Sequence, residues 1–154
     1  KLYVSKQGGR NYLMCKCTED NRFYAIRTDY IKSVSQGLKA NDFSIIKTRF
    51  EDISRYIWGV SYSAGRLEHL EMDIYVGKGE EYILSRLERE KRCGKVTKLD
   101  EETYRFSADL YDSYEALPWI RTFFGRIKRL KCSNRMVSDQ IKFDIVKMSK
   151  QYGE

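Results

Sequence analysis

Long apolar runs are missing from this chain of 154 residues, and no stretch approaches the roughly 20 apolar residues that a membrane-spanning helix needs. No apolar leader opens the sequence, so we expect a soluble protein of the cytoplasm. One proline and 10 glycines are too few for a long flexible linker. Because 12 Tyr, 7 Phe and 2 Trp provide large apolar side chains, the composition excludes a disordered chain and predicts globular folding.

Histidine is nearly absent, since His69 is the only one in the sequence. A lone histidine cannot provide a Ser-His-Asp set or a His-rich metal site. The cysteines are Cys15, Cys17, Cys93 and Cys132, a spacing that fits neither a zinc site nor a disulfide scaffold, and we interpret them as reduced thiols. No glycine-rich nucleotide loop is present either. We therefore expect no metal, no cofactor and no enzymatic activity.

Positive charge is concentrated near the end of the chain. Residues 121–150 contain two acidic residues and nine basic ones: Arg121, Arg126, Lys128, Arg129, Lys131, Arg135, Lys142, Lys147 and Lys150. This stretch carries the whole net charge of +7, because the other residues balance at 20 of each sign. A localised basic surface indicates an anionic partner, although lysines that only keep a surface solvated are an equal alternative.

Apolar and polar residues alternate through the first 35 residues with the period of β-strands. The alternation predicts strands at residues 2–5, 11–17 and 23–34. Residues 18–21 are Thr, Glu, Asp and Asn, which favour a turn, so the second and third strands are expected to form a hairpin. This part of the chain therefore predicts a small, incomplete antiparallel sheet.

Helical spacing begins at Phe50 and continues through Ile53, Ile57 and Val60. We predict a helix here that connects two lobes. The polar stretch 36–44 in front of it is the candidate boundary.

From about residue 65 onward, the spacing of apolar residues switches repeatedly between the period of a strand and the period of a helix. Asp112 and Glu115 resemble a capping box, and Pro118 is expected to restart the helix that follows. The predicted elements are a strand at 70–76, a helix at 80–92, strands at 95–99 and 104–110, a helix at 112–124, a strand at 127–132, and a last helix with a stripe of Val137, Ile141, Ile145, Met148 and Tyr152. This order fits an α+β fold, a ferredoxin-like βαββαβ lobe with an extra C-terminal helix.

Two segments resemble a known family. Asn11-Tyr12-Leu13, followed by residues 23–31 (FYAIRTDYI), resembles the WYL domain, although Asn11 replaces the name-giving Trp and Tyr30 replaces the second Arg of R-x-D-R-I. Residues 117–127 (LPWIRTFFGRI) are similar to the signature of the C-terminal extension that accompanies WYL domains.

The resemblance implies an Sm-like or SH3-like β-barrel portion at residues 1–35, a linker and connecting helix at 36–64, and the ferredoxin-like extension at 65–154. It further implies the ligand-sensing and dimerisation module of a bacterial transcriptional regulator that senses nucleic acid or nucleotides and works as a homodimer. Promoter DNA would then be bound by an N-terminal domain upstream of Lys1. The apolar stripe of the last helix independently favours a homodimer.

Arg27 is the strongest candidate for binding an anionic effector. Its guanidinium can offer a planar, permanently charged fork to a phosphate. Tyr12, Tyr24 and Tyr30 lie near it in the sequence pattern and can offer ring faces to bases. The alternative is a structural ion pair with Asp29.

The other candidates are placed around Arg27. Tyr12 and Lys16 share a predicted strand face and are expected to line the same pocket, although core packing alone is an equal alternative for Tyr12. Asp29 is expected to orient a cation or to cap a turn rather than to touch an anionic ligand. Ser5 matches a serine of the family and is expected to donate a hydrogen bond to phosphate.

A second anion site or a DNA-facing surface is expected at Arg121, Arg126 and Lys128, which begin the basic stretch. The aromatic residues between them, at helical spacing in 119–124, are expected to be core.

Two rival functions remain open. A stand-alone ferredoxin-like module that itself binds nucleic acid is the first, and the lack of an aromatic K/R-G-F/Y-G/A-F pattern in the strands counts against it. An enzyme that uses cysteines or carboxylates is the second. Nucleotide hydrolysis that is lost on replacing Cys15 or Cys17 would favour it.

Overall fold

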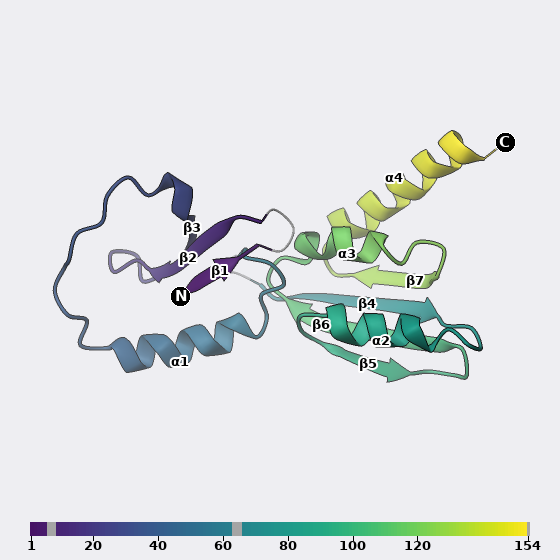
Figure 1. Cartoon of the computed structure of the whole chain (residues 1–154), viewed down its shortest axis with the longest axis horizontal. Coiled ribbons are helices and arrows are strands. Elements are labelled where there is room, and N and C mark those ends of the chain that lie inside the picture. The colour runs from purple at the N-terminus through teal and green to yellow at the C-terminus, as the bar shows by residue number, and fades with distance from the viewer. Residues whose placement is uncertain (6–8, 63–65, 154) are drawn as a thin grey trace.

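The computed structural model describes residues 1–5, 9–62 and 66–153 and is a mixed α/β structure with two antiparallel β-sheets, which Figure 1 shows side by side. Three strands form the N-terminal sheet in the order β1-β2-β3, and four form the C-terminal sheet in the order β5-β6-β4-β7. Within the described ranges, no helix has the length and apolar character needed to cross a membrane. The predicted domain boundary at residue 65 lies outside the described residues.

The N-terminal sheet consists of β1 (Leu2–Val4), β2 (Asn11–Lys16) and β3 (Phe23–Arg27). The predicted hairpin is confirmed: β2 and β3 pair antiparallel, and Asn21 adopts a φ of 60°, which the turn requires. The prediction that the third strand continues to residue 34 is wrong. The chain leaves the sheet after Arg27 in a single 3₁₀ turn, η1 (Thr28–Tyr30), where Asp29 folds back to hold the Arg27 side chain.

Helix α1 (Phe43–Ser54) connects the lobes, but its bounds differ from the prediction. It begins seven residues before Phe50, inside the stretch 36–44 that was the candidate boundary, and it ends before Ile57. Phe50 and Ile53 bury their side chains against Met14 and Phe23 of the sheet. Ile57 belongs to the same cluster although it lies beyond the helix, because the chain turns there rather than continuing.

The C-terminal sheet confirms the predicted four-stranded antiparallel arrangement. Its strands are β4 (Glu68–Tyr75), β5 (Lys95–Lys98), β6 (Thr103–Leu110) and β7 (Ile127–Cys132), and its helices are α2 (Glu81–Glu90), α3 (Leu117–Arg121) and α4 (Arg135–Tyr152). Pro118 lies in the first turn of α3, as predicted, after a 3₁₀ turn, η2 (Ser113–Ala116). Helix α3 ends earlier than the predicted residue 124, in turns that reach Gly125.

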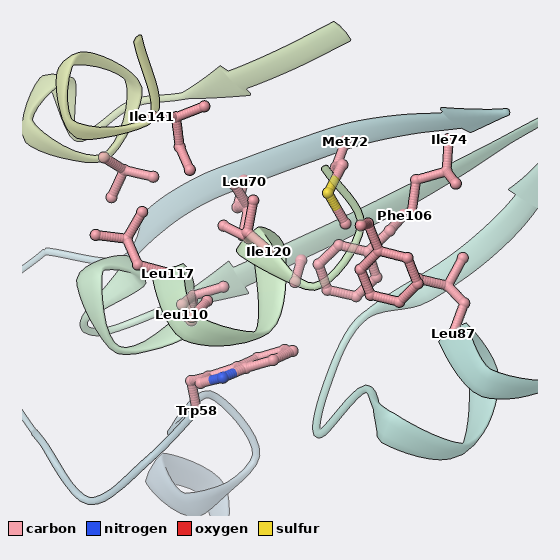
Figure 2. Packing of buried hydrophobic residues seen from close by; sticks show 14 of the residues in the cluster. Trp58, Leu70, Met72, Ile74, Leu87, Phe106, Leu110, Leu117, Ile120 and Ile141 are labelled. Carbon is pink, nitrogen blue, oxygen red and sulfur yellow. The ribbon is translucent and has the colours of Figure 1, made fainter. Parts of the chain in front are cut away.

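One face of this sheet carries the main core. Alternate residues of β4 point to it, and Leu70 and Met72 stand beside Ala108 and Phe106 of β6 in the pairing register. Figure 2 shows Leu87 of α2 and Ile120 of α3 pointing into the same cluster. Helices α2 and α3 therefore cover one face of the sheet, as predicted, and the aromatic segment 119–124 is part of the core.

Trp58 anchors the connecting segment to the C-terminal lobe. Its side chain is 2% exposed and packs against Trp119 and Phe106, with ring centroids 4.8 and 5.9 Å away. Figure 2 shows the indole beneath α3. The Arg92 guanidinium donates to the Trp58 carbonyl oxygen at 2.6 Å, so the backbone is held as well.

Glu115 does not complete the predicted capping box. Asp112 caps η2 by accepting from the Tyr114 amide, but the Glu115 carboxylate accepts from the backbone amides of Gly59 (2.9 Å), Val60 and Ser61 (both 3.1 Å). A Cβ at Gly59 would collide with this carboxyl group, so a side chain there would displace the Glu115 carboxylate from the amides that it binds. The carboxylate thus ties the segment after Trp58 to the C-terminal lobe.

Helix α4 buries only its first half. Val137 and Ile141 enter the core, whereas Ile145, Met148 and Tyr152 of the predicted stripe are exposed. Figure 1 shows why: the C-terminal half of α4 projects beyond the sheet. The expected incomplete cover of the stripe is confirmed.

Candidate ligand-binding site

Arg27 ends β3 and lies opposite Tyr12 of β2 in the pairing register. Its Nε donates to the Asp29 carboxylate at 3.1 Å, a second guanidinium nitrogen pairs with the other oxygen of that carboxylate, and the third donates to the Tyr30 hydroxyl at 2.8 Å. The guanidinium also stacks 4.1 Å from the Tyr30 ring centroid. Each terminal nitrogen keeps a second N–H outside these contacts, and the side chain is 22% exposed.

Asp29 orients the cation, which is one of the two roles expected for it. Hydrogen bonding from Arg27 lowers the pKa of the Asp29 carboxyl group, and the same pair raises the pKa of Arg27. Both groups are therefore charged at neutral pH. The ion pair that the sequence left open as an alternative is present, and an anionic ligand would have to bind through the N–H groups that Asp29 leaves unused.

The tyrosines divide between the two faces of the sheet. Tyr12 and Arg27 share one face by their register, and Tyr30 reaches Arg27 from η1. Tyr24 does not join them, because it is an odd number of residues from Arg27 along β3. Its hydroxyl hydrogen-bonds to Asp20 in the hairpin instead.

Ser5 follows β1 on the same face as Tyr12, two residues after Tyr3, which pairs with Tyr12. Its amide donates to the Arg10 carbonyl at 2.8 Å, and its carbonyl accepts from Gly9. The structure thus brings Arg27, Tyr12 and Asp29 together, with Ser5 at the same end of the sheet.

Lys16 lies on the same face but at the other end of β2, where it pairs with Phe23 rather than with Arg27. Its ammonium lies 3.5 Å from Asp42. Lys16 lines a different hollow of about 490 Å³ between the sheet and α1, whose apolar wall includes Phe43 and Ile46. The sequence did not predict this apolar wall, because α1 begins inside the polar stretch 36–44, which was interpreted as the boundary between the lobes.

The proposed second anion site is dispersed. Arg121 donates to Asp144 of α4 at 2.8 Å, Arg126 binds both oxygens of Glu80 at 2.6 and 2.7 Å, and Lys128 donates to Thr103 at 2.9 Å. Each cation thus has a separate partner within the fold. Both arginines are held by carboxylates, which reduces their capacity to bind an external phosphate.

The Arg126–Glu80 pair gives a pH-dependent contribution to stability. Hydrogen bonding from Arg126 lowers the pKa of Glu80 to about 2. A carboxyl group with a lowered pKa stabilises the fold above its unfolded pKa, and that contribution disappears as pH falls toward the folded value. We expect Arg126→Met to lower the free energy of unfolding at neutral pH, with a difference from wild type that shrinks between about pH 4.5 and about pH 2. Urea unfolding across this range measures it, and a difference independent of pH would contradict the assignment.

His69 lies on β4, with its Nδ1 2.6 Å from Asp109, and hydrogen bonding to Asp109 raises its pKa. Among the described residues, no group of His, Cys, Asp or Glu is arranged to hold a metal ion. The cysteines are free, and burial raises the pKa of Cys93 to about 11, so its thiol is protonated at neutral pH.

Comparison of the chain with protein-family models, with curated proteins and with solved structures found no match.

Proposed function

We propose that this chain is the ligand-sensing and dimerisation module of a WYL-type transcriptional regulator and that it binds an anionic nucleotide or a single-stranded nucleic acid. The observation that carries the proposal is the Arg27 group: a guanidinium fixed by Asp29, stacked on Tyr30 and opposite Tyr12. A guanidinium whose rotamer is already fixed loses little freedom on binding phosphate. The neighbouring rings offer stacking surface to a base.

The arrangement of elements supports the same proposal. The strand order β5-β6-β4-β7 with α2 and α3 on one face is the order of a ferredoxin-like βαββαβ lobe, and α4 is the additional helix. The small antiparallel sheet before α1 has the place that the SH3-like barrel has in the proposed family. In this proposal α1 and Trp58 join the sensing lobe to the lobe that dimerises.

Dimerisation is proposed to use the exposed apolar residues of α4. Met136, Phe143 and Val146 are 66%, 61% and 53% exposed and lie on the helix face opposite Val137 and Ile141. Burying such side chains between two copies is worth roughly 1.5 to 3 kcal/mol each.

We expect Phe143→Asp to weaken the homodimer more than about tenfold, because it places a charge in the apolar contact. Sedimentation velocity over a concentration series measures the change. Tyr82→Asp, at a similarly exposed position on α2, is the matched control and should leave the dimer unchanged. Monomeric wild type at tens of micromolar, or equal effects of the two substitutions, would contradict this interface.

Binding of a short fluorescein-labelled single-stranded oligonucleotide, followed by fluorescence anisotropy, tests the proposed activity. We expect saturable binding that weakens as salt rises, since a phosphate contact releases counterions. No binding at low salt would contradict the proposed function.

A further inference from the structure

Strand β7 is an edge strand, and one side of it is open. Among the strands of the described ranges, it pairs only with β4. Two hollows, of about 420 and 410 Å³, lie along it. All six residues of β7 line one hollow or the other, and Leu130, Ser138 and Lys142 line both. The hollows therefore form one trough, which we call the β7 trough, between the open edge of the strand and helix α4.

The walls of the β7 trough are apolar near the start of the strand. Ile127 and Leu130 provide the strand side, and Ile141, Ile145 and Met148 provide the helix side. Ile145 and Met148 are 53% and 44% exposed, because α4 diverges from the sheet here. A chain lying in the trough could thus bury apolar side chains while its backbone pairs with β7.

Basic side chains line the β7 trough along its length. Lys128, Arg129 and Lys131 come from β7, and Lys142 faces them from α4. Their internal partners are few: Arg129 lies 3.8 Å from Asp73, Lys142 lies 3.9 Å from Asp139, and Lys128 donates to the neutral Thr103 hydroxyl. Of the residues that the structure describes, Glu71 is the one carboxylate that lines either hollow, and it lies 3.6 Å from His69.

The positive charge of the β7 trough distinguishes between two possible occupants, a second copy of β7 and an acidic segment. A second copy of β7, paired antiparallel at the same edge, would set Lys128, Arg129 and Lys131 against the same cations of its partner. An acidic segment would instead complement them. We propose that the β7 trough binds an extended acidic segment of a partner protein, which adds a fifth strand to the sheet and places apolar side chains at alternate positions against Ile127, Leu130 and Ile145.

A blocked synthetic peptide of about six residues, the usual length of a strand, provides the probe. It alternates valine with glutamate, and its twin alternates valine with lysine. We expect the acidic peptide to bind at least about tenfold more tightly than the twin. Methylating alternate backbone nitrogens of the acidic peptide should abolish binding, because the ladder loses its donors. Amide hydrogen exchange should slow in β7 when the acidic peptide is added.

Variants of the chain locate the site. The double substitution Lys131→Glu with Lys142→Glu should weaken acidic-peptide binding at least about tenfold. The matched control is Lys95→Glu with Lys98→Glu, which makes the same charge change on β5, the other edge strand. Oligonucleotide binding at Arg27 should be the same in both variants, which shows that they fold and separates this inference from the proposed function. Equal binding of the two peptides, binding that survives methylation, equal effects of the two double variants, or no binding up to about 1 mM would overturn the proposal.

Discussion

Trp58→Ala is expected to cost about 3 to 5 kcal/mol of unfolding free energy, the usual cost of removing a buried tryptophan side chain. Trp58 is almost fully buried and contacts Trp119 and Phe106, so its removal leaves a cavity in the main core. The same side chain holds the connecting segment against the C-terminal lobe. Urea unfolding followed by circular dichroism measures the loss.

Phe43→Ala is the control for Trp58→Ala. Phe43 is also aromatic and also lies in the connecting region, but it is 66% exposed, so its removal should change stability by less than about 0.5 kcal/mol. A loss below about 1 kcal/mol for Trp58→Ala would show that the indole does not anchor the segment.

Arg27→Ala is expected to remove most of the affinity for a short oligonucleotide, a loss of more than about tenfold, because charge-assisted hydrogen bonds to phosphate are among the stronger polar contacts. Arg27→Lys should recover only part of the affinity, since a point charge cannot reproduce the planar fork. The dependence of affinity on salt should also become shallower in the alanine variant.

Arg22→Ala is the matched control for Arg27→Ala. Arg22 lies in the hairpin between β2 and β3, at the opposite end of the sheet from Arg27. Its replacement should leave oligonucleotide affinity unchanged. A similar loss in both variants would indicate non-specific attraction to the basic chain rather than a site at Arg27.

The C-terminal lobe could be predicted from sequence because its strands have one buried face. Leu70, Met72 and Ile74 alternate with polar residues, and that alternation determines both the strand and the face that packs. The helix between Glu81 and Glu90 could be predicted equally well, from the spacing of its apolar residues and from its charged ends.

The connecting region could not be predicted in the same way. Ile57 and Val60 continue a helical spacing, yet they are buried by contacts outside any helix. The contact that fixes this segment comes from Glu115, more than 50 residues away, and local spacing contains no information about it. The start of α1 at Phe43 was missed because the residues before it are mostly polar.

Within the candidate site, the sequence predicted which residues share a strand face but not how far apart they lie. Tyr12 and Lys16 share a face, as predicted, but the strand separates them. Tyr24 could have been excluded from the group around Arg27, because alternation along β3 already assigns it to the other face. The pairing of Arg126 with Glu80, 46 residues apart, depends on tertiary structure and left no local signal.

One titration tests the central claim most directly. A single labelled oligonucleotide is titrated with wild type, Arg27→Ala, Arg126→Ala and Lys128→Ala under the same salt conditions. A site at Arg27 predicts a large loss in Arg27→Ala and near-wild-type affinity in the other two, because Arg126 and Lys128 have partners within the C-terminal lobe. Unchanged affinity in Arg27→Ala, with losses in Arg126→Ala and Lys128→Ala, would contradict the assignment and place the anion site in the basic stretch.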